Sequence, residues 1–319
     1  LESGTIEMLK MAGVSSRLEK EGFKHDGIQL SFKNHGFRIN LKKLTNKYVT
    51  VYGQTEVTKD LYEIIQKKNG TIINNAEEVF PKEIDTENPY VTFKKNGIET
   101  KITCDFIVGC DGYHGISRST IPKNIIRTHE RVYPFGWLGI LSETSPVSDE
   151  LIYANHGSGF ALASMRNQNL SRYYIQTSLN DKIEDWPDIK FWDELKKRLP
   201  TEAAETIMTG QSIEKSIAPL RSFVCEPMSW KKLFLVGDAA HIVPPTGAKG
   251  LNLAFSDVYY LYKAFEQYYK FEINDDLDIY SSKALSRVWK AIRFSWWMTT
   301  TFHKFPGQTS FDQRIQDSE

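Results

Sequence analysis

The sequence of 319 residues predicts an α/β (α+β) fold in which one mixed domain is interrupted by a second domain built on a β-sheet. A strand pattern over 48–52 is followed by apolar residues at helical spacing as far as Asn69-Gly70. Over 133–213 the pattern changes to short alternating strands rich in Trp and Tyr. A buried strand over 232–236 and a long helical pattern follow, which indicates that the chain returns to its first domain.

The remaining elements follow from local signals taken in chain order. Ile6, Leu9 and Met11 have a loose helical spacing, which predicts a helix over 3–14. Asn96-Gly97 predicts a tight hairpin turn because both residues tolerate positive φ, and Gly70 suits the end of the helix before it. The other predicted elements are strands over 27–32, 37–41, 90–93, 98–104 and 105–110, and helices over 191–199, 250–269 and 284–302.

Composition favours a small-molecule ligand. The 40 basic residues equal the 40 acidic ones, so no net charge draws the chain to nucleic acid or to an anionic membrane. No apolar run is long enough for a membrane helix and the first ten residues do not have the layout of a signal peptide, which predicts a cytoplasmic protein. Cys104, Cys110 and Cys225 lack metal-ligand spacing and His241 lacks a second histidine, so neither a disulfide nor a metal site is expected.

The most informative stretch covers residues 233–252. A buried strand ends at Asp238, where a carboxylate can accept hydrogen bonds from sugar-like hydroxyls. Gly247 and Gly250 let backbone amides approach a ligand, and the N-terminus of the next helix favours an anionic ring system. Gly-Asp-Ala-Ala taken alone is equally consistent with an ordinary strand–turn–helix joint.

A second motif covers residues 107–118. Gly109, Gly112 and Gly115 permit close backbone approach, and Arg118 can contact a phosphate. In isolation a Cys-Asp-Gly turn is weak evidence for a nucleotide site. Its order and distance relative to the first motif make the pair specific.

A third group of residues lies in the inserted sheet. Strand alternation predicts that Ser164 and Arg166 share one face and can hold a carboxylate. A hairpin turn centred near Asn169 would set Ser164 opposite Tyr174 and add a phenol donor. The alternative is a solvated strand face that carries an unrelated Arg and Ser.

The two glycine-containing motifs together resemble those of the flavoprotein aromatic hydroxylases. The resemblance covers nearly the whole chain and includes residues 133–139 and 216–221. It implies a glutathione-reductase-like FAD/NAD(P)-binding domain with an inserted mixed β-sheet substrate domain. The implied segments are FAD-binding residues 1–131 and 218–275, a substrate domain over 132–217 and a helical region over 276–319.

The resemblance also implies the activity and its site residues. NADPH, O2 and FAD would convert 4-hydroxybenzoate to 3,4-dihydroxybenzoate through a C4a-hydroperoxyflavin, in a homodimer. The implied flavin contacts are Gln54, Asp238, Lys249, Leu251 and Asn252, and the implied NADPH contacts are His114, Arg118 and Arg221. The substrate contacts would be Ser164, Arg166 and Tyr174 at the carboxylate, and Tyr153 with the Pro245 carbonyl at the 4-hydroxyl; a surface histidine, His25, would end a proton relay.

One departure from the family pattern is the absence of a GxGxxG motif for the FAD pyrophosphate. Since the sequence starts at Leu1, we expect a fragment truncated at both ends, with the second tyrosine of the relay beyond Glu319 and with weak FAD binding. A related hydroxylase for another phenolic acid and a non-catalytic aromatic-acid-binding module are the alternatives. The preference for NADPH over NADH is not determined by these residues.

Overall fold

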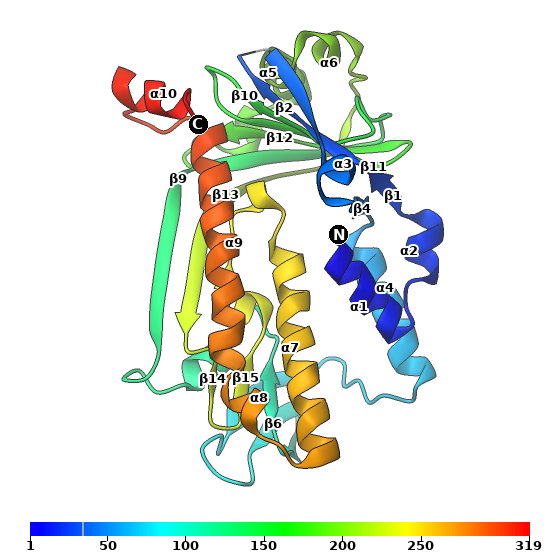
Figure 1. Ribbon diagram of the computed structural model, residues 1–319, viewed down its shortest axis with the longest axis vertical. Helices are drawn as coiled ribbons and strands as arrows, with labels where there is room; N and C mark the ends of the chain where they lie inside the picture. Colours follow the sequence, from blue (N-terminus) through cyan, green and yellow to red (C-terminus); the bar gives the residue numbers. More distant parts are fainter. Residues whose placement is uncertain (34) are drawn as a thin grey trace. The chain divides into compact units, whose positions relative to one another are not determined.

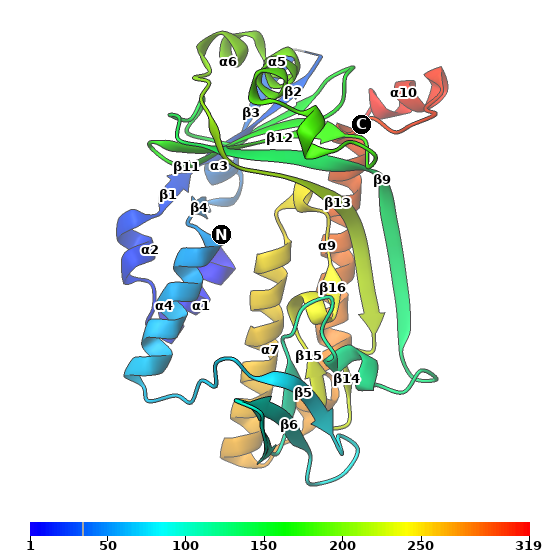
Figure 2. The same ribbon diagram turned by 180° about the vertical axis from the view of Figure 1, so that it is seen from behind.

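The computed structural model describes residues 1–33 and 35–319, which form two compact units (Figures 1 and 2). Unit 1 comprises residues 1–62, 132–220 and 297–319, and unit 2 comprises residues 63–131 and 221–296. Both units contain helices and strands, as expected for the α/β class. The domains implied by the resemblance place residues 1–62 with the FAD-binding segments, whereas here these residues belong to unit 1. The assignment of functional domains stays a prediction.

Most of a large mixed sheet lies in unit 1. Its strand order is β16-β13-β9-β12-β11-β10-β2-β3, and β10 runs parallel to β2 while the other described pairs are antiparallel. Its strands are β2 (Gly27–Phe32), β3 (His35–Asn40), β9 (Arg127–Ser142), β10 (Ile152–Asn155), β11 (Ala161–Asn167), β12 (Leu170–Thr177), β13 (Ser212–Glu226) and β16 (His241–Ile242). The predicted mixed sheet is confirmed, but β2, β3 and β16, which lie outside residues 132–217, belong to it as well.

The two faces of the sheet have different neighbours. Tyr173 and Ile175 alternate with less buried residues along β12 and face α5 (Asp188–Arg198) and α6 (Thr201–Thr206). Figures 1 and 2 show these two helices over that side of the sheet. The opposite face buries Leu162 and several aromatic residues, among them Tyr153 and Phe302, the last of which ends α9 (Tyr280–Phe302). Period-two alternation therefore separates a structural core from a second, aromatic face.

The N-terminal segment of unit 1 adds a small two-stranded sheet, with β1 paired to β4. The helix predicted up to Asn69-Gly70 is confirmed. The residue with left-handed backbone at its end is Asn69 (φ 55°), and Gly70 donates its N–H to the Ile65 carbonyl. The elements here are α1 (Ser3–Ala12), α2 (Ser16–Glu21), β1 (Phe23–His25), α3 (Leu41–Thr45), β4 (Val49–Val51) and α4 (Gln54–Lys67), whose last turn belongs to unit 2; α10 (Ser310–Gln316) ends unit 1.

Unit 2 contains two three-stranded sheets. The first comprises β5 (Glu77–Lys82), β6 (Tyr90–Lys95) and β7 (Ile98–Thr103), and its predicted hairpin turn is confirmed with positive φ at both Asn96 and Gly97. The second has the order β14-β15-β8, from β8 (Ile107–Gly109), β14 (Ser229–Trp230) and β15 (Leu233–Leu235). Buried residues of β15 pack with residues of α7 (Gly250–Phe271), α8 (Asp275–Asp278) and α9 in one hydrophobic cluster. Within the described residues, no helix is both long and apolar enough to cross a membrane.

A buried histidine anchors the aromatic face of unit 1. The indole N–H of Trp137 donates to Nε2 of His303 at 2.6 Å, and Nδ1 of His303 lies 2.9 Å from the carbonyl of Thr299. Because an indole N–H can only donate, the proton of the neutral imidazole must lie on Nδ1. The ring stacks on Phe135 and Phe160, and burial lowers the pKa of His303 to about 3.

We expect His303 to make the protein sensitive to acid. The unfolded imidazole titrates near pH 6.5, so the stabilisation is fully present above that pH and is lost as the pH falls toward about 3. Between pH 6 and 4 this group should lower the free energy of unfolding by about 1.4 kcal/mol per pH unit. Urea unfolding at several pH values should show a shallower slope for His303→Gln than for the wild type. Equal slopes would contradict the assignment.

Candidate functional site

The two glycine-containing motifs meet at one edge of a sheet in unit 2. Strand β15 runs parallel to β8 with Leu235 opposite Gly109, and the Val236 N–H donates to the Gly109 carbonyl at 3.0 Å. The segments that follow these strands therefore leave from the same carboxyl edge, where ligands bind in open α/β sheets.

Asp238 lies in the turn directly after β15. Its side chain is exposed and, within the described residues, has no hydrogen-bond or ion-pair partner. Partial desolvation of the carboxyl group raises the pKa of Asp238, and this effect is opposed by His241. An available carboxylate at this edge can accept hydrogen bonds from the hydroxyl groups of a ligand.

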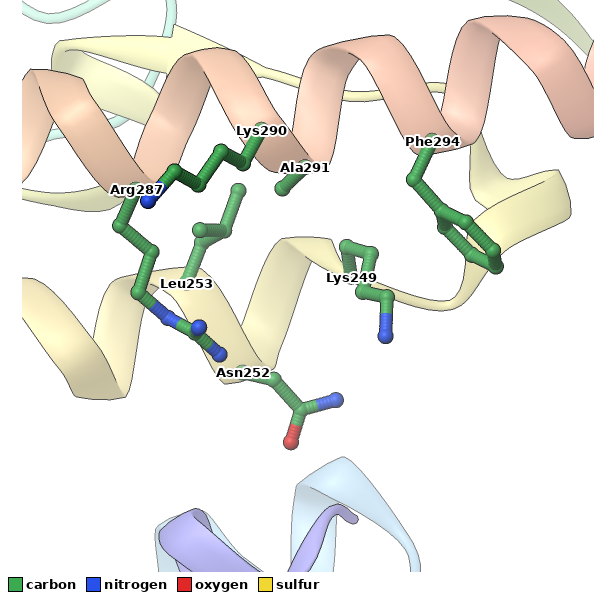
Figure 3. A pocket seen from close by; sticks show the side chains of 7 residues that line it. All are labelled: Lys249, Asn252, Leu253, Arg287, Lys290, Ala291 and Phe294. Atoms are coloured by element: carbon green, nitrogen blue, oxygen red, sulfur yellow. The ribbon is translucent and has the colours of Figure 1, made fainter. Parts of the chain in front are cut away.

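A cavity of about 200 Å³ opens beside the start of α7 (Figure 3). Among the residues described, no side-chain cap hydrogen bond is formed at this helix end, where the positive end of the helix dipole lies. Seven residues from the start of α7 and from α9 line the cavity: Lys249, Asn252, Leu253, Arg287, Lys290, Ala291 and Phe294. The lining includes three cationic side chains and no acidic one. The helix N-terminus and these cations together favour an anionic group.

Two glycines of the 107–118 motif, Gly109 and Gly115, are required by the packing of the chain itself, and the close approach of a ligand to this motif stays a prediction. A Cβ atom on Gly109 would lie 2.5 Å from the side chain of Ser117. On Gly115 it would lie 2.1 Å from the carboxyl carbon of Asp111, whose Oδ2 accepts the Ser117 N–H. Only Gly112 has a positive φ, at 74°. Ligand approach is not what requires glycine at 109 and 115.

Gly247 in the later motif also faces the protein. A Cβ atom there would lie 2.5 Å from Oγ of Ser295, whereas on Gly250 it would be no closer than 3.8 Å to Val243. Of these two glycines, only Gly250 could carry a Cβ atom without a close contact.

The three residues implied in NADPH binding surround one tyrosine ring. The guanidinium groups of Arg118 and Arg221 lie 5.1 and 4.6 Å from the ring centroid of Tyr113, and His114 contacts the same ring edge-to-face. Arg118 also donates to the carbonyls of Tyr113 and Ala239, and Arg221 pairs with Glu130. The structure therefore brings these residues together, and part of the hydrogen-bonding capacity of Arg118 is used within the protein.

Two of the implied substrate residues, Tyr153 and Tyr174, share the aromatic face of the large sheet. Cross-strand pairing places Leu30, Tyr153, Leu162, Tyr174 and Gly139 in one row, so their side-chain positions point to the same side. Burial raises the pKa of Tyr153 to about 12, so its hydroxyl stays protonated at neutral pH. Among the described residues this hydroxyl has no hydrogen-bond partner, and its ring contacts are Phe160 and Phe302.

The predicted pairing of Ser164 with Tyr174 is wrong. Ser164 lies opposite Arg172, and Tyr174 lies opposite Leu162. The connection between β11 and β12 is shorter than predicted, because Asn167 already pairs with Leu170, and this shifts the register. Ser164 and Tyr174 remain diagonal neighbours on one face.

Arg166 occupies an irregularity in β11. Met165 pairs with Ser171 and Asn167 with Leu170, so Arg166 is the extra residue of a β-bulge. The strict alternation from which a shared face of Ser164 and Arg166 was predicted is interrupted here. The Arg166 side chain is exposed while Ser164 is buried. Bulges commonly redirect a side chain beside a functional site.

His25 is buried, which corrects its assignment as a surface residue. It is 2% exposed because β1 pairs with β4 and places His25 opposite Val49. Neither ring nitrogen has a hydrogen-bond partner in the described part of the chain, and burial lowers the pKa of His25. A buried imidazole without partners can take part in proton transfer only through a group that reaches it.

Two further implied residues, Gln54 and Pro245, are exposed. Gln54 is the first residue of α4 and belongs to unit 1. Pro245 belongs to unit 2, and its carbonyl accepts the Ala248 N–H at 2.9 Å, which leaves one lone pair for a ligand.

His241 pairs with Asp257 in the interior of unit 2. Among the described residues, no group of three or more His, Cys, Asp or Glu side chains is arranged to hold a metal ion.

Sequence reasoning missed Gly139, although a glycine inside a strand signals the close approach of a neighbouring group. A Cβ atom on Gly139 would lie 2.6 Å from Cε1 of Tyr174, so the absence of a side chain here lets the Tyr174 ring lie across β9.

We expect Gly139→Ala to displace Tyr174 and to weaken the binding of a ligand that this phenol contacts by about tenfold, the loss of roughly one hydrogen bond. The matched control is Gly36→Ala on β3, where a Cβ atom would be 3.8 Å from its nearest neighbour. A titration of both variants with an aromatic acid tests this, and equal affinities would contradict it.

A family model for an FAD binding domain matches residues 1–295. The chain belongs to the flavin-dependent aromatic hydroxylase family. The p-hydroxybenzoate hydroxylase of Acinetobacter baylyi is 52% identical over 320 aligned positions, which cover all of this chain and 79% of that protein. A kynurenine 3-monooxygenase of Aspergillus candidus is 28% identical over 203 positions, which cover 59% of this chain and 40% of that relative.

Two solved structures have the same fold. The p-nitrophenol 4-monooxygenase PnpA of Pseudomonas putida superposes with a TM-score of 0.81 at 15% identity, covering 99% of this chain and 82% of that one. PqsL of Pseudomonas aeruginosa in complex with 2-aminobenzoylacetate gives a TM-score of 0.82 at 17% identity, covering 99% of this chain and 87% of the other. At these identities the likeness extends to the fold alone.

FAD is the cofactor of this family, and the residues of unit 2 suit it. The available carboxylate of Asp238 can accept the hydroxyl groups of a ribityl chain. The uncapped start of α7 and the cationic cavity beside it can stabilise negative charge on a flavin ring. Both features are observations of this chain and agree with the family assignment.

Proposed function

We propose that this protein hydroxylates 4-hydroxybenzoate to 3,4-dihydroxybenzoate, using FAD, NADPH and O2. In this reaction NADPH supplies two electrons, one oxygen atom enters the ring and the other leaves as water. When bound, the flavin passes the electrons of NADPH to oxygen. The single observation that carries the proposal is the 52% identity to p-hydroxybenzoate hydroxylase over the whole chain.

Arg166, Ser164 and Tyr174 are proposed to hold the substrate carboxylate. An Arg–carboxylate contact is charge-assisted and fixes the orientation of a planar acid. The exposed Arg166 at the bulge and the diagonal Ser164–Tyr174 pair supply a guanidinium and two hydroxyl groups from adjacent strands, and the Ser164 hydroxyl, which donates to the Met165 carbonyl at 3.3 Å, would rotate toward the ligand. These donors would place the ring over the aromatic face of the sheet.

Tyr153 is proposed to hydrogen-bond the 4-oxygen of the substrate. Hydroxylation of the ring is an electrophilic substitution, so the ring must be electron-rich, and the phenolate is richer than the phenol. The Tyr153 hydroxyl stays protonated because burial raises its pKa to about 12, and it can therefore donate to the phenolate. A donor to the charged form lowers the pKa of the substrate. The Pro245 carbonyl is the proposed acceptor when the substrate hydroxyl is protonated.

His25 is proposed to exchange the substrate proton with solvent through intervening groups. Its buried ring nitrogens have no partner among the described residues, so a water molecule or hydroxyl group would satisfy them. The lowered pKa of His25 keeps it neutral between transfers. NADPH is proposed to contact His114, Arg118 and Arg221 around Tyr113, and the working form is proposed to be a cytoplasmic homodimer.

The test uses the protein expressed from its complete gene and loaded with FAD. We expect 4-hydroxybenzoate to stimulate NADPH oxidation and 3,4-dihydroxybenzoate to form in equal amount. Parallel assays with NADH establish the nucleotide preference. Stimulation without dihydroxylated product would favour a related hydroxylase for another phenolic acid. Ligand binding without NADPH oxidation would favour a non-catalytic aromatic-acid-binding module.

A further inference from the structure

A buried carboxylate links two parts of the proposed flavin site. Oδ2 of Asp257, on α7, accepts the Gly237 N–H at 3.0 Å and lies 2.6 Å from Nε2 of His241. Asp257 and His241 are each 1% exposed. With the imidazole proton on Nε2, His241 donates to the same oxygen that accepts the Gly237 N–H.

The two residues that contact this carboxylate, Gly237 and His241, lie on either side of Asp238 in the sequence. Gly237 precedes it and has a φ of +61°, a conformation that L side chains rarely adopt. Ala254 packs closely against the same glycine: a Cβ atom added to Gly237 would lie 3.2 Å from the Ala254 Cβ. The turn that presents Asp238 is therefore held from both sides by α7.

The same helix presents the backbone amides of the site. Asp257 lies two turns after the start of α7 at Gly250. One carboxylate thus fixes the distance between the Asp238 turn and the amides at the helix start. These are the two elements proposed to contact the flavin.

We propose that Asp257 and His241 are positioning residues for FAD. The pair holds the Asp238 turn on α7, so that the Asp238 carboxylate and the helix N-terminus contact one flavin simultaneously. This inference rests on the proposed flavin contacts. Neither residue needs to touch the cofactor.

The test compares FAD dissociation constants, visible circular dichroism of the bound flavin and thermal unfolding of the apoprotein, all on the full-length protein. His241→Leu removes the N–H donor, and we expect it to raise the FAD Kd at least about tenfold and to alter the flavin dichroism. His241→Gln restores an N–H near Nε2, and its Kd should stay within about threefold of the wild type. Should His241→Leu fail to fold, Asp257→Leu, which is close in size and has no acceptor oxygen, should show the same weakening.

Tyr280→Phe is the matched control. Its hydroxyl donates to the Leu235 carbonyl at 2.8 Å, so the variant loses a buried hydrogen bond in the same unit and keeps both hydrogen-bond contacts of Asp257. It should lower the unfolding temperature and leave the FAD Kd unchanged. If His241→Leu behaves like Tyr280→Phe, with lower stability but unchanged Kd and dichroism, the pair only supports folding and the inference is wrong. If the wild type binds no FAD, the proposed function fails as well.

Discussion

Arg166→Met should weaken the binding of 4-hydroxybenzoate about 100-fold. The proposed contact is a forked, charge-assisted pair, and each hydrogen bond to a charged group is worth roughly 1.5–3 kcal/mol. Methionine keeps the length and the apolar stem of the side chain but has no donor. Titration of the flavin absorbance or fluorescence with substrate measures the change in Kd.

Two comparisons make this result specific. Phenol lacks the carboxylate, so its weaker binding should be the same in the wild type and in Arg166→Met. Arg38→Met is the matched control, since Arg38 also lies on the large sheet but forms its two hydrogen bonds with Glu150, at 2.6 and 2.7 Å. That exposed pair should be worth little for ligand affinity. A Kd for 4-hydroxybenzoate within about twofold of the wild type in Arg166→Met would remove this residue from the substrate site.

Local signals predicted the elements that position the site. Asn96-Gly97 specifies its own turn, and residues 27–32 form the predicted strand with the same bounds. The apolar runs of β8 and β15, each followed by a glycine-rich turn, indicated strands before the two motifs were placed side by side. These features depend on neighbours a few residues away in sequence.

The wrong predictions concern strand register and burial, which the pairing of strands decides. The Ser164 register depends on a two-residue connection and on the bulge at Arg166, and no local pattern marks that bulge. His25 is buried because β1 pairs with β4, more than twenty residues further along the chain. The Asp257–His241 pair joins a helix to a strand, and neither residue stands in a pattern that identifies the other. Strand register and buried polar pairs are thus what the sequence alone did not provide.

Tyr153→Phe should reduce the hydroxylation rate about 100-fold. This is the lower end of the rate loss that is typical when a side chain that assists proton transfer is removed. The phenyl ring preserves the contacts with Phe160 and Phe302, so the aromatic face should remain packed. Without the hydroxyl donor, the bound substrate should ionise at a pH at least about one unit higher. Ultraviolet difference spectra of bound 4-hydroxybenzoate against pH report this ionisation directly.

Tyr173→Phe separates this effect from a general loss of packing. Tyr173 is also fully buried, but it lies one residue from Tyr174 and faces the opposite side of the sheet, beside Trp192. Its removal should leave the ionisation of the substrate unchanged. In Tyr153→Phe the substrate should still bind, because the carboxylate contacts persist, while NADPH oxidation yields less dihydroxylated product. An unchanged ionisation curve in Tyr153→Phe would mean that another donor stabilises the phenolate, since a hydrogen bond to the charged form cannot be removed without raising the pKa.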